Sequence, residues 1–310
     1  MKEYDLVIIG GGVAGLSAAQ YGSRANLKVA VLENAIIGGQ VFNIMDLENY
    51  PGVYPPVNGA DFVETMKHQA ESFGAEFFLT QVSSIDKIGN KFKIQTSDGT
   101  FSSFTVLIAT GASHRKLDIP GETKFSGRGV SYCATCDGPF FRNKKIVVIG
   151  GGDSACDEAT YLSTLSNDVT LIHRRGSLRA QKAVAERVLK NPKIKTIFNT
   201  IVTEISGDEI VKKITLQNVE TGVTSKLECD GVFIFVGMIP QTDLVDMLTK
   251  DEDGYIITDE EMRTNVLGMY VAGDIRNKPF RQIVTAASDG AIAAWSAAKL
   301  IREIHGEVYK

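Results

Sequence analysis

Two cysteines separated by two residues, Cys133 and Cys136, have the clearest spacing for redox chemistry in the chain. A Cys-x-x-Cys pair closes a small disulfide ring or supplies half of a tetrahedral zinc site. Zinc needs two more ligands, but Cys156 and Cys229 are isolated, and none of the four histidines has ligand spacing with another. The spacing therefore favours a redox-active pair, with zinc as the alternative.

Asp137 follows the second cysteine of the pair directly. Its carboxylate is suited to accept or donate the proton that dithiol–disulfide exchange moves. An aspartate before Gly138 and Pro139 is equally typical of a turn, so both interpretations stay open. The isolated Cys156 and Cys229 fit small apolar positions better than reactive thiols.

A glycine-rich motif occurs twice, at an offset of 140 residues, as GxGxxG from Gly10 to Gly15 and as GxGxxA from Gly150 to Ala155. Around each motif, in residues 4–35 and 144–175, an apolar strand precedes an amphipathic helix and a second apolar strand. This is the pattern of a βαβ unit with a parallel sheet. Such a glycine turn lets a pyrophosphate approach the backbone at the start of a helix, so the sequence predicts two dinucleotide sites.

The two copies differ at the end of the second strand. Twenty-three residues after the first glycine, one copy has Glu33 and the other has His173, followed by Arg174, Arg175 and Arg179. A carboxylate there accepts hydrogen bonds from ribose hydroxyls, whereas arginines pair with a 2′-phosphate. The first site is therefore expected to hold FAD or NAD and the second NADP(H), although a basic run is also typical of a solvated surface.

Composition limits the remaining classes of function. The chain has 310 residues, enough for about two domains, and its 44% hydrophobic and 23% charged residues are typical of a globular protein. A net charge of −4 argues against general binding to nucleic acid. No apolar run reaches the roughly 18 residues of a membrane span, and the N-terminus has no signal-peptide pattern. We therefore expect a cytoplasmic protein that binds neither nucleic acid nor membrane.

Several motifs occur in a specific order along nearly the whole chain. They are GGGVAG, GGQ, ENYPG, ATGA, CATCDGPFF, GGGDSA, HRRGSLRA, VGMIPQT, VAGD and RQIVTAASDG. This order resembles the low-molecular-weight bacterial thioredoxin reductases, class II of the pyridine nucleotide–disulfide oxidoreductases. In the glutathione-reductase-like branch the redox cysteines follow the first glycine motif, where this chain has none. One conservative departure is Val41, where the family more often has Leu or Met.

The resemblance implies an α/β fold of two Rossmann-like domains with small antiparallel β insertions. Residues 1–113 and 246–310 are expected to form a discontinuous FAD-binding domain, because the C-terminal segment has no counterpart in the second copy. Residues 114–245 are expected to form the NADPH-binding domain, which carries the redox pair. The segments near Ser113 and Pro240 are the expected hinges, and each also fits an ordinary loop.

The resemblance also implies the residues of each site. FAD is expected to be held by Gly10, Gly12, Ala14, Gly15, Glu33, Gly39, Gln40, Asn49, Thr110, Gly111, Asp274, Arg281, Gln282 and Ile283. NADPH is expected to be held by Gly152, Asp153, Ser154, His173, Arg174, Arg175 and Arg179. The catalytic residues are expected to be Cys133, Cys136 and Asp137, with Cys136 facing the flavin.

The implied activity is that of a thioredoxin-disulfide reductase. Reducing equivalents pass from NADPH through FAD to the Cys133–Cys136 disulfide and then to oxidised thioredoxin, and the expected assembly is a homodimer. The alternative is a related flavoprotein disulfide reductase that acts on another thioredoxin-like partner or uses another electron donor. A rival of a different class is a nucleotide-binding redox sensor, which would turn NADPH over slowly.

Overall fold

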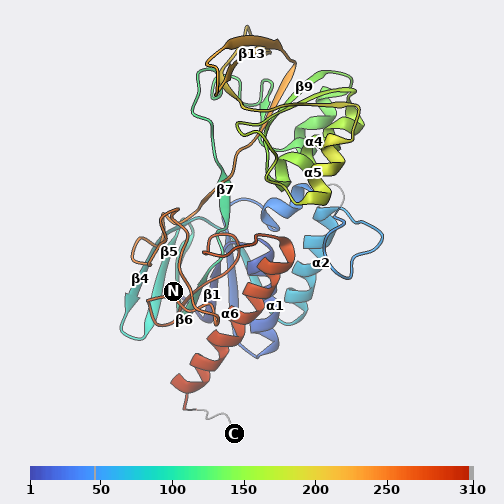
Figure 1. The fold of residues 1–310 in the computed structure, drawn as a ribbon. Coiled ribbons are helices and arrows are strands. Elements are labelled where there is room, and N and C mark those ends of the chain that lie inside the picture. The colour runs from blue at the N-terminus through green and yellow to red at the C-terminus, as the bar shows by residue number, and fades with distance from the viewer. Residues whose placement is uncertain (45–46, 307–310) are drawn as a thin grey trace. The chain divides into compact units, whose positions relative to one another are not determined.

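The computed structural model describes residues 1–44 and 47–306. The chain divides into two compact units, Met1–Ser113 with Ile239–Lys310, here called unit 1, and His114–Met238, here called unit 2 (Figure 1). The α/β class with Rossmann-like units expected from the sequence is confirmed. No helix in the described part of the chain is long and apolar enough to cross a membrane.

The return crossing between the units differs from the expected position at residues 245–246. It lies at Met238–Ile239, because the residues that follow belong to unit 1. The backbone N–H of Gln241 donates to the carbonyl of Gly111 at 3.0 Å. Val245 is fully buried in a core of unit 1. These contacts of Gln241 and Val245 with unit 1 place the return crossing before Ile239.

Unit 1 is built on one seven-stranded sheet in the order β3-β2-β1-β6-β5-β4, with β17 paired to β6. The strands β1, β2, β3, β6 and β17 run parallel to one another, whereas β5 runs antiparallel to both of its neighbours, β6 and β4. The strands are β1 (Lys2–Ile9), β2 (Val29–Glu33), β3 (Glu76–Leu79), β4 (Val82–Ile88), β5 (Lys91–Thr96), β6 (Gly99–Ile108) and β17 (Met269–Val271).

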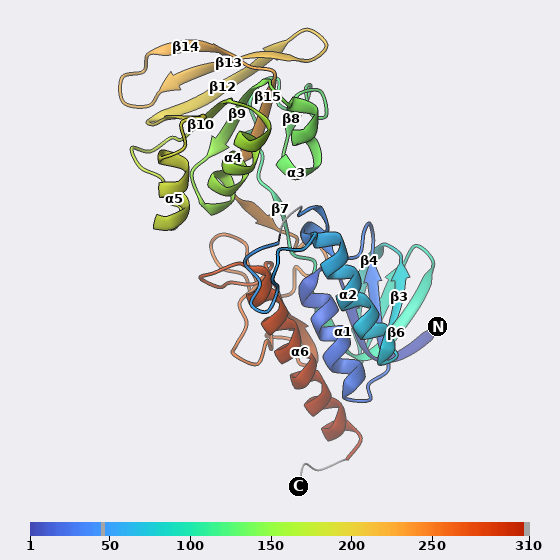
Figure 2. The same ribbon diagram turned by 90° about the vertical axis from the view of Figure 1, so that its right-hand side faces the viewer.

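Both faces of this sheet are covered, which explains its continuous apolar strands. Leu6 and Ile8 of β1 point to a core shared with α1 and α6, whereas Val7 and Ile9 point to a core shared with the segment after the return crossing. The helices of unit 1 lie side by side over one face of the sheet (Figure 2). They are α1 (Val13–Arg24), α2 (Gly59–Ser72) and α6 (Ile283–Ile304), and a short 3₁₀ turn, η1, spans Gly39–Asn43.

Unit 2 has a five-stranded parallel sheet in the order β11-β10-β9-β15-β8. Helices cover one face through Ile146 and Val148, and a separate antiparallel sheet, β12-β13-β14, covers the other through Val147 and Ile149. Its strands are β8 (Val130–Ser131), β9 (Lys145–Gly150), β10 (Asp168–Ile172), β11 (Ile194–Ile197), β12 (Thr200–Gly207), β13 (Val211–Asn218), β14 (Thr224–Glu228) and β15 (Gly231–Phe235). Its helices are α3 (Ala134–Asp137), α4 (Asp153–Leu165) and α5 (Lys182–Leu189), with a 3₁₀ turn, η2, at Gly138–Phe141.

The two segments by which the chain crosses between the units pair with each other. They are β7 (Ala112–His114) and β16 (Met238–Pro240), which form a two-stranded sheet. Both expected hinge segments therefore begin in regular structure rather than as separate loops.

We expect Gly290→Ala to destabilise unit 1. Gly290 lies in α6, where a Cβ atom would overlap the carbonyl oxygen of Ala14 in α1. Overpacking against backbone costs about 3 kcal/mol, more than the ~1 kcal/mol that alanine gains in helix propensity. The fluorescence of Trp295, the single tryptophan, reports thermal unfolding of this unit. Ser288→Ala, at an exposed position of the same helix, is the control. Equal unfolding temperatures for the two variants would contradict the packing argument.

Candidate functional site

The first glycine turn joins β1 to α1 at the carboxyl edge of the sheet in unit 1. Gly10 has φ of +107°, and a Cβ there would overlap the carbonyl oxygen of Ala109. Gly15 packs equally closely on the carbonyl oxygen of Gly10. Gly12 is the N-cap of α1, and no described side chain caps the helix or places a negative charge in its first turn. The free N–H groups and the positive helix end therefore suit a pyrophosphate.

Glu33 ends β2 beside this turn. Its Oε2 accepts a hydrogen bond from the N–H of Gly11 at 2.7 Å, and its Oε1 accepts one from the N–H of Ala35 at 2.9 Å. These two bonds hold the carboxylate at the glycine turn. A carboxylate has further lone pairs, so it remains able to accept a ribose hydroxyl.

The other candidates from the first half of unit 1 lie in α1, in η1 and in loops, and several of them form hydrogen bonds with neighbouring segments. Gly39 has φ of +57° and opens η1 close to Gly12, and the Gln40 side-chain amide donates to the carbonyl of Ala112 at 2.7 Å. Asn49 Nδ2 donates to Gln282 Oε1 at 3.1 Å. Thr110 donates to the carbonyl of Gln241 at 2.8 Å, and Gly111 has φ of +69°. Ala14 is buried in the first turn of α1. The fold therefore gathers these candidates around one edge of unit 1.

The C-terminal candidates follow β17 and lead into α6. Oδ1 of Asp274 is buried and accepts no hydrogen bond from any described residue. Arg281 lies over the ring of Tyr255 at 3.7 Å, and its Nε donates to the carbonyl of Asp274 at 3.3 Å. Gln282 is the N-cap of α6 and Ile283 its first residue. A buried carboxylate oxygen that accepts no hydrogen bond from the described residues fits a hydroxyl-rich dinucleotide, so these residues fit FAD.

The second glycine turn joins β9 to α4 in unit 2. Gly150 has φ of +156°, and a Cβ there would overlap the carbonyl oxygen of Phe235. Gly152 is the N-cap of α4 and has open space around its Cα, and Ser154 is exposed in the first turn. Asp153 accepts hydrogen bonds from the backbone N–H of Gln181 at 2.6 Å and from its side chain at 3.1 Å.

The basic residues of unit 2 lie beside that turn. His173 ends the β10 region and is 4% exposed. Burial, and next the charge of Arg179, lower the pKa of His173, which keeps the imidazole neutral near pH 7. Arg174, Arg175 and Arg179 are exposed, and the N–H of Arg179 donates to the carbonyl of Gly151 at 2.7 Å. The backbone of Arg179 is thus fixed at the glycine turn, and the three exposed guanidinium groups are open to a phosphate.

The redox motif lies in unit 2 before β9. Cys133 is disulfide-bonded, and its N–H donates to Ser131 Oγ at 3.0 Å. Cys136 lies in α3, but its side chain is outside the described part of the structure. Asp137 ends α3, and its N–H donates to the carbonyl of Cys133 at 3.2 Å.

The isolated cysteines are buried free thiols. Burial is the largest cause that raises the pKa of Cys156 to about 11 and that of Cys229 to about 12. Both are therefore protonated at neutral pH and are poor nucleophiles. Among the described residues, no group of three or more His, Cys, Asp or Glu side chains is placed to hold a metal ion.

One buried cluster next to the redox motif was not predicted. Tyr132 precedes Cys133, and its hydroxyl donates to Glu122 Oε1 at 2.6 Å. Glu122 is 2% exposed and also accepts hydrogen bonds from the N–H groups of Leu117 and Asp118. A glutamate ten residues before a tyrosine carries no sequence signal of such a contact, because charged residues are usually solvated.

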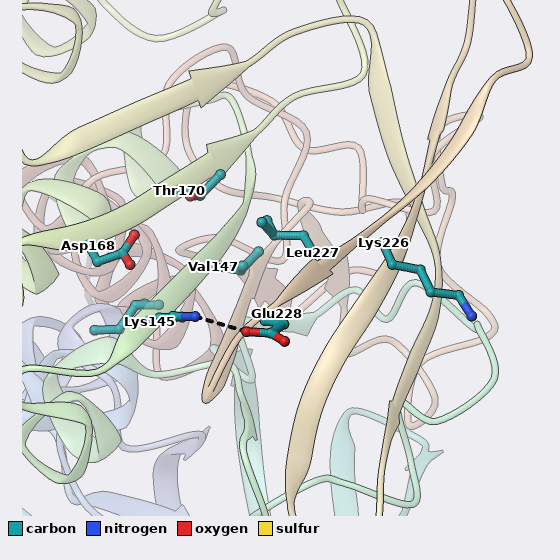
Figure 3. A pocket seen from close by; sticks show the side chains of 8 residues that line it. Lys145, Val147, Asp168, Thr170, Lys226, Leu227 and Glu228 are labelled. Atoms are coloured by element: carbon teal, nitrogen blue, oxygen red, sulfur yellow. Dashed lines mark hydrogen bonds and ion pairs between the residues drawn. The ribbon is translucent and has the colours of Figure 1, made fainter.

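A cavity of about 270 Å³ opens elsewhere in unit 2 (Figure 3). It is lined by Lys145, Asp168 and Glu228, among others, and Lys145 Nζ lies 3.0 Å from Glu228 Oε2. Lys145 and Asp168 begin β9 and β10, so this cavity is at the amino ends of the parallel strands. Ligands of open α/β sheets bind outside the carboxyl ends, and the cavity is therefore not a dinucleotide site.

The chain is similar to known proteins over nearly its whole length. Residues 4–290 match the family model described as pyridine nucleotide-disulphide oxidoreductase. The chain is 54% identical over 299 residues to a thioredoxin reductase of Treponema pallidum, covering 96% of this chain and 97% of that protein. It is similar to the crystal structure of Lactococcus lactis thioredoxin reductase, with a TM-score of 0.93, 46% identity and coverage of 97% and 99% of the two chains. A thioredoxin reductase from T. acidophilum has a TM-score of 0.91 at 37% identity, with coverage of 96% and 99%.

The exposed arginines lead to a prediction about cofactor choice. We expect Arg174→Ala combined with Arg175→Ala to raise the KM for NADPH at least about tenfold, because each charged hydrogen bond contributes about 1.5–3 kcal/mol. The KM for NADH, which has no 2′-phosphate, should stay nearly constant. Steady-state kinetics with both nucleotides measures the difference. Lys226→Ala, which removes a positive charge beside the cavity of Figure 3, is the control. Equal losses for both nucleotides would contradict the 2′-phosphate assignment.

Proposed function

The chain belongs to the pyridine nucleotide-disulphide oxidoreductase family, and from this we propose that it is a thioredoxin reductase, which uses NADPH to reduce the disulfide of thioredoxin. FAD is its cofactor. The observation that carries this function is a disulfide-bonded Cys133 in a Cys-x-x-Cys motif, within a chain that has two glycine-turn dinucleotide units. A redox-active cysteine pair in a chain with two dinucleotide units is suited to relay electron pairs rather than to serve as a structural crosslink.

We propose that unit 1 holds FAD. The N–H groups at the start of α1 bind the pyrophosphate, Glu33 binds the ribose hydroxyls, and Asp274 accepts a hydrogen bond through Oδ1, which accepts none from the described residues. The positive end of α6 favours negative charge beside Gln282 and Ile283. When bound, FAD accepts a hydride from a nicotinamide and supplies an electron pair to a disulfide.

We propose that unit 2 holds NADPH. The turn at Gly152 receives the pyrophosphate, and Arg174, Arg175 and Arg179 pair with the 2′-phosphate. The neutral imidazole of His173 packs against Gly151 and so lines the glycine turn. NADH has no 2′-phosphate, so the three arginines distinguish NADPH from NADH by binding that phosphate.

The Cys133–Cys136 pair carries the exchange in this proposal. Two electrons and two protons convert its disulfide to two thiols. One thiolate then attacks the disulfide of thioredoxin, which forms a mixed disulfide and releases one partner thiolate. The second cysteine displaces the other partner sulfur and restores the ring. We assign Cys136 to the flavin side and Asp137 to the proton that these steps move.

The assembly and the motion are also proposals. The family resemblance supports a homodimer and a cytoplasmic location. It also supports a rotation of unit 2 that alternately brings the nicotinamide or the redox pair to the flavin. The crossing strands β7 and β16 are the segments about which such a rotation would occur. Light scattering should give twice the 33.6 kDa of one chain, and a mass of one chain would contradict the dimer.

Steady-state oxidation of NADPH in the presence of purified thioredoxin tests the function, together with an absorption spectrum for bound flavin. We expect Cys136→Ser to retain the flavin and to lose thioredoxin reduction by at least about 10³-fold, because one thiol cannot form the ring disulfide. Cys156→Ala, which removes a buried free thiol of raised pKa, is the matched control and should stay active. Full activity of Cys136→Ser would contradict the dithiol mechanism. Slow turnover by the unaltered protein would favour the redox-sensor alternative.

A further inference from the structure

Four charged side chains form a cluster where the segment after β17 leads into α6; Lys278 and Asp289 are buried, whereas the Asp274 side chain is 36% exposed. They are Asp274, Arg276, Lys278 and Asp289, called here the β17–α6 cluster. Asp289 lies at its centre, 5% exposed, and accepts hydrogen bonds from Arg276 Nη1 at 2.9 Å and Lys278 Nζ at 3.0 Å. The N–H of Gly273 donates to Asp289 as well, at 3.1 Å. Every oxygen of this carboxylate therefore has a donor.

Lys278 is the unusual member of the cluster. Its side chain is 6% exposed, although lysine is among the residues that are least often buried. A buried ammonium is costly unless it is paired, so a lysine placed here needs its carboxylate neighbours. The pairing with Asp289 meets that need. Asp289 also pairs with Arg276, so its single negative charge is shared between two cations.

Lys278 nevertheless reaches two further groups. Its Nζ donates to Thr285 Oγ1 at 3.3 Å, and it lies 3.6 Å from Oδ1 of Asp274. Thr285 is the residue whose hydroxyl accepts from the Gln282 backbone N–H in the capping box of α6. Lys278 therefore joins the end of β17 to the first turn of α6 through one ammonium group.

Asp274 is the residue that this arrangement affects. Its Oδ1 is buried and has no hydrogen-bond partner in the described part of the chain. Burial raises the pKa of Asp274, Lys278 and Arg281 oppose that rise, and Asp289 adds to it. These are the charged groups that face the carboxyl group from its own loop and from α6. Without Lys278, Asp274 would hold a proton at a higher pH than it does in the intact protein.

We propose that Lys278 is a positioning residue for FAD: anchored on Asp289, it keeps Asp274 ionised, with Oδ1 available as an acceptor, at the start of α6. This inference rests on the proposed function, because Asp274 is one of the residues assigned to FAD. Arg276, whose Nε donates to Thr258 at 2.9 Å, holds the other side of Asp289 and belongs to the same support. The cluster thus links the ionisation of a ligand residue to the geometry of the helix beside it.

The test compares FAD release from the holoenzymes of the intact protein and Lys278→Met across pH 6 to 8. Released FAD is measured by its fluorescence after dilution, which gives a dissociation constant without any activity assay. For the intact protein we expect the dissociation constant to rise only at a lower pH than in Lys278→Met, because Lys278 favours the ionised form of Asp274. For Lys278→Met we expect weaker binding that worsens as the pH falls, approaching about tenfold per pH unit below the raised pKa of Asp274.

Lys299→Met, on α6 and exposed, is the matched control and should behave as the intact protein does. Asp274→Asn cannot titrate, so adding Lys278→Met to it should change FAD affinity equally at all pH values. Lys278→Gln serves the same comparison if the methionine variant does not fold. The unaltered chain provides a further measurement, since any fall in its affinity at acidic pH should disappear in Asp274→Asn.

Two results would overturn the inference. One is a loss of affinity in Lys278→Met that is the same at pH 6 and pH 8, which would make the lysine a structural brace only. The other is an affinity equal to that of the intact protein. An intact protein that binds no FAD would instead refute the proposed function, so the two failures are distinguishable.

Discussion

The close approach of backbone to backbone at Gly10 and Gly150 is the constraint on which both units depend. In each unit, the carbonyl oxygen at the end of the neighbouring strand occupies the space of a Cβ atom, Ala109 against Gly10 and Phe235 against Gly150. The turn can therefore stay tight, and the helix can begin at once with its N–H groups uncovered. Glu33 and Gly39 lie beside the first of these helix starts, and Arg179 lies beside the second.

One scaffold serves two chemistries because only the surroundings of the turn differ. In unit 1 a carboxylate, Glu33, is fixed to the glycine turn by two backbone N–H groups. In unit 2 the corresponding position is His173, which is buried and neutral, with exposed guanidinium groups beyond it. In the proposed function, the backbone of each turn binds a dinucleotide, and the side chain after the second strand distinguishes one dinucleotide from the other.

The sequence predicted what depends on local pattern. The strands, the glycine turns and the helices α1 and α4 follow from apolar runs and from the repeat of GxGxx in the same context. The sequence placed the return crossing at residues 245–246 instead of Met238–Ile239, because the burial of Val245 depends on contacts with strands far away in the chain. The pairs Glu122–Tyr132 and Lys278–Asp289 were missed for a related reason. Charged residues are solvated by default, and only tertiary structure shows which of them are buried with a partner.

The burial of Cys156 and Cys229 bears on how such a protein survives repeated turnover. Thiolates, not thiols, are the nucleophiles that attack peroxides and other electrophiles, and these two sulfurs are protonated in the interior of unit 2. Overoxidation and mispaired crosslinks therefore have no ready starting point at either residue. The two cysteines outside the motif thus stay protonated, so thiol–disulfide exchange is confined to the Cys133–Cys136 pair, whose disulfide the reaction cycle itself reduces.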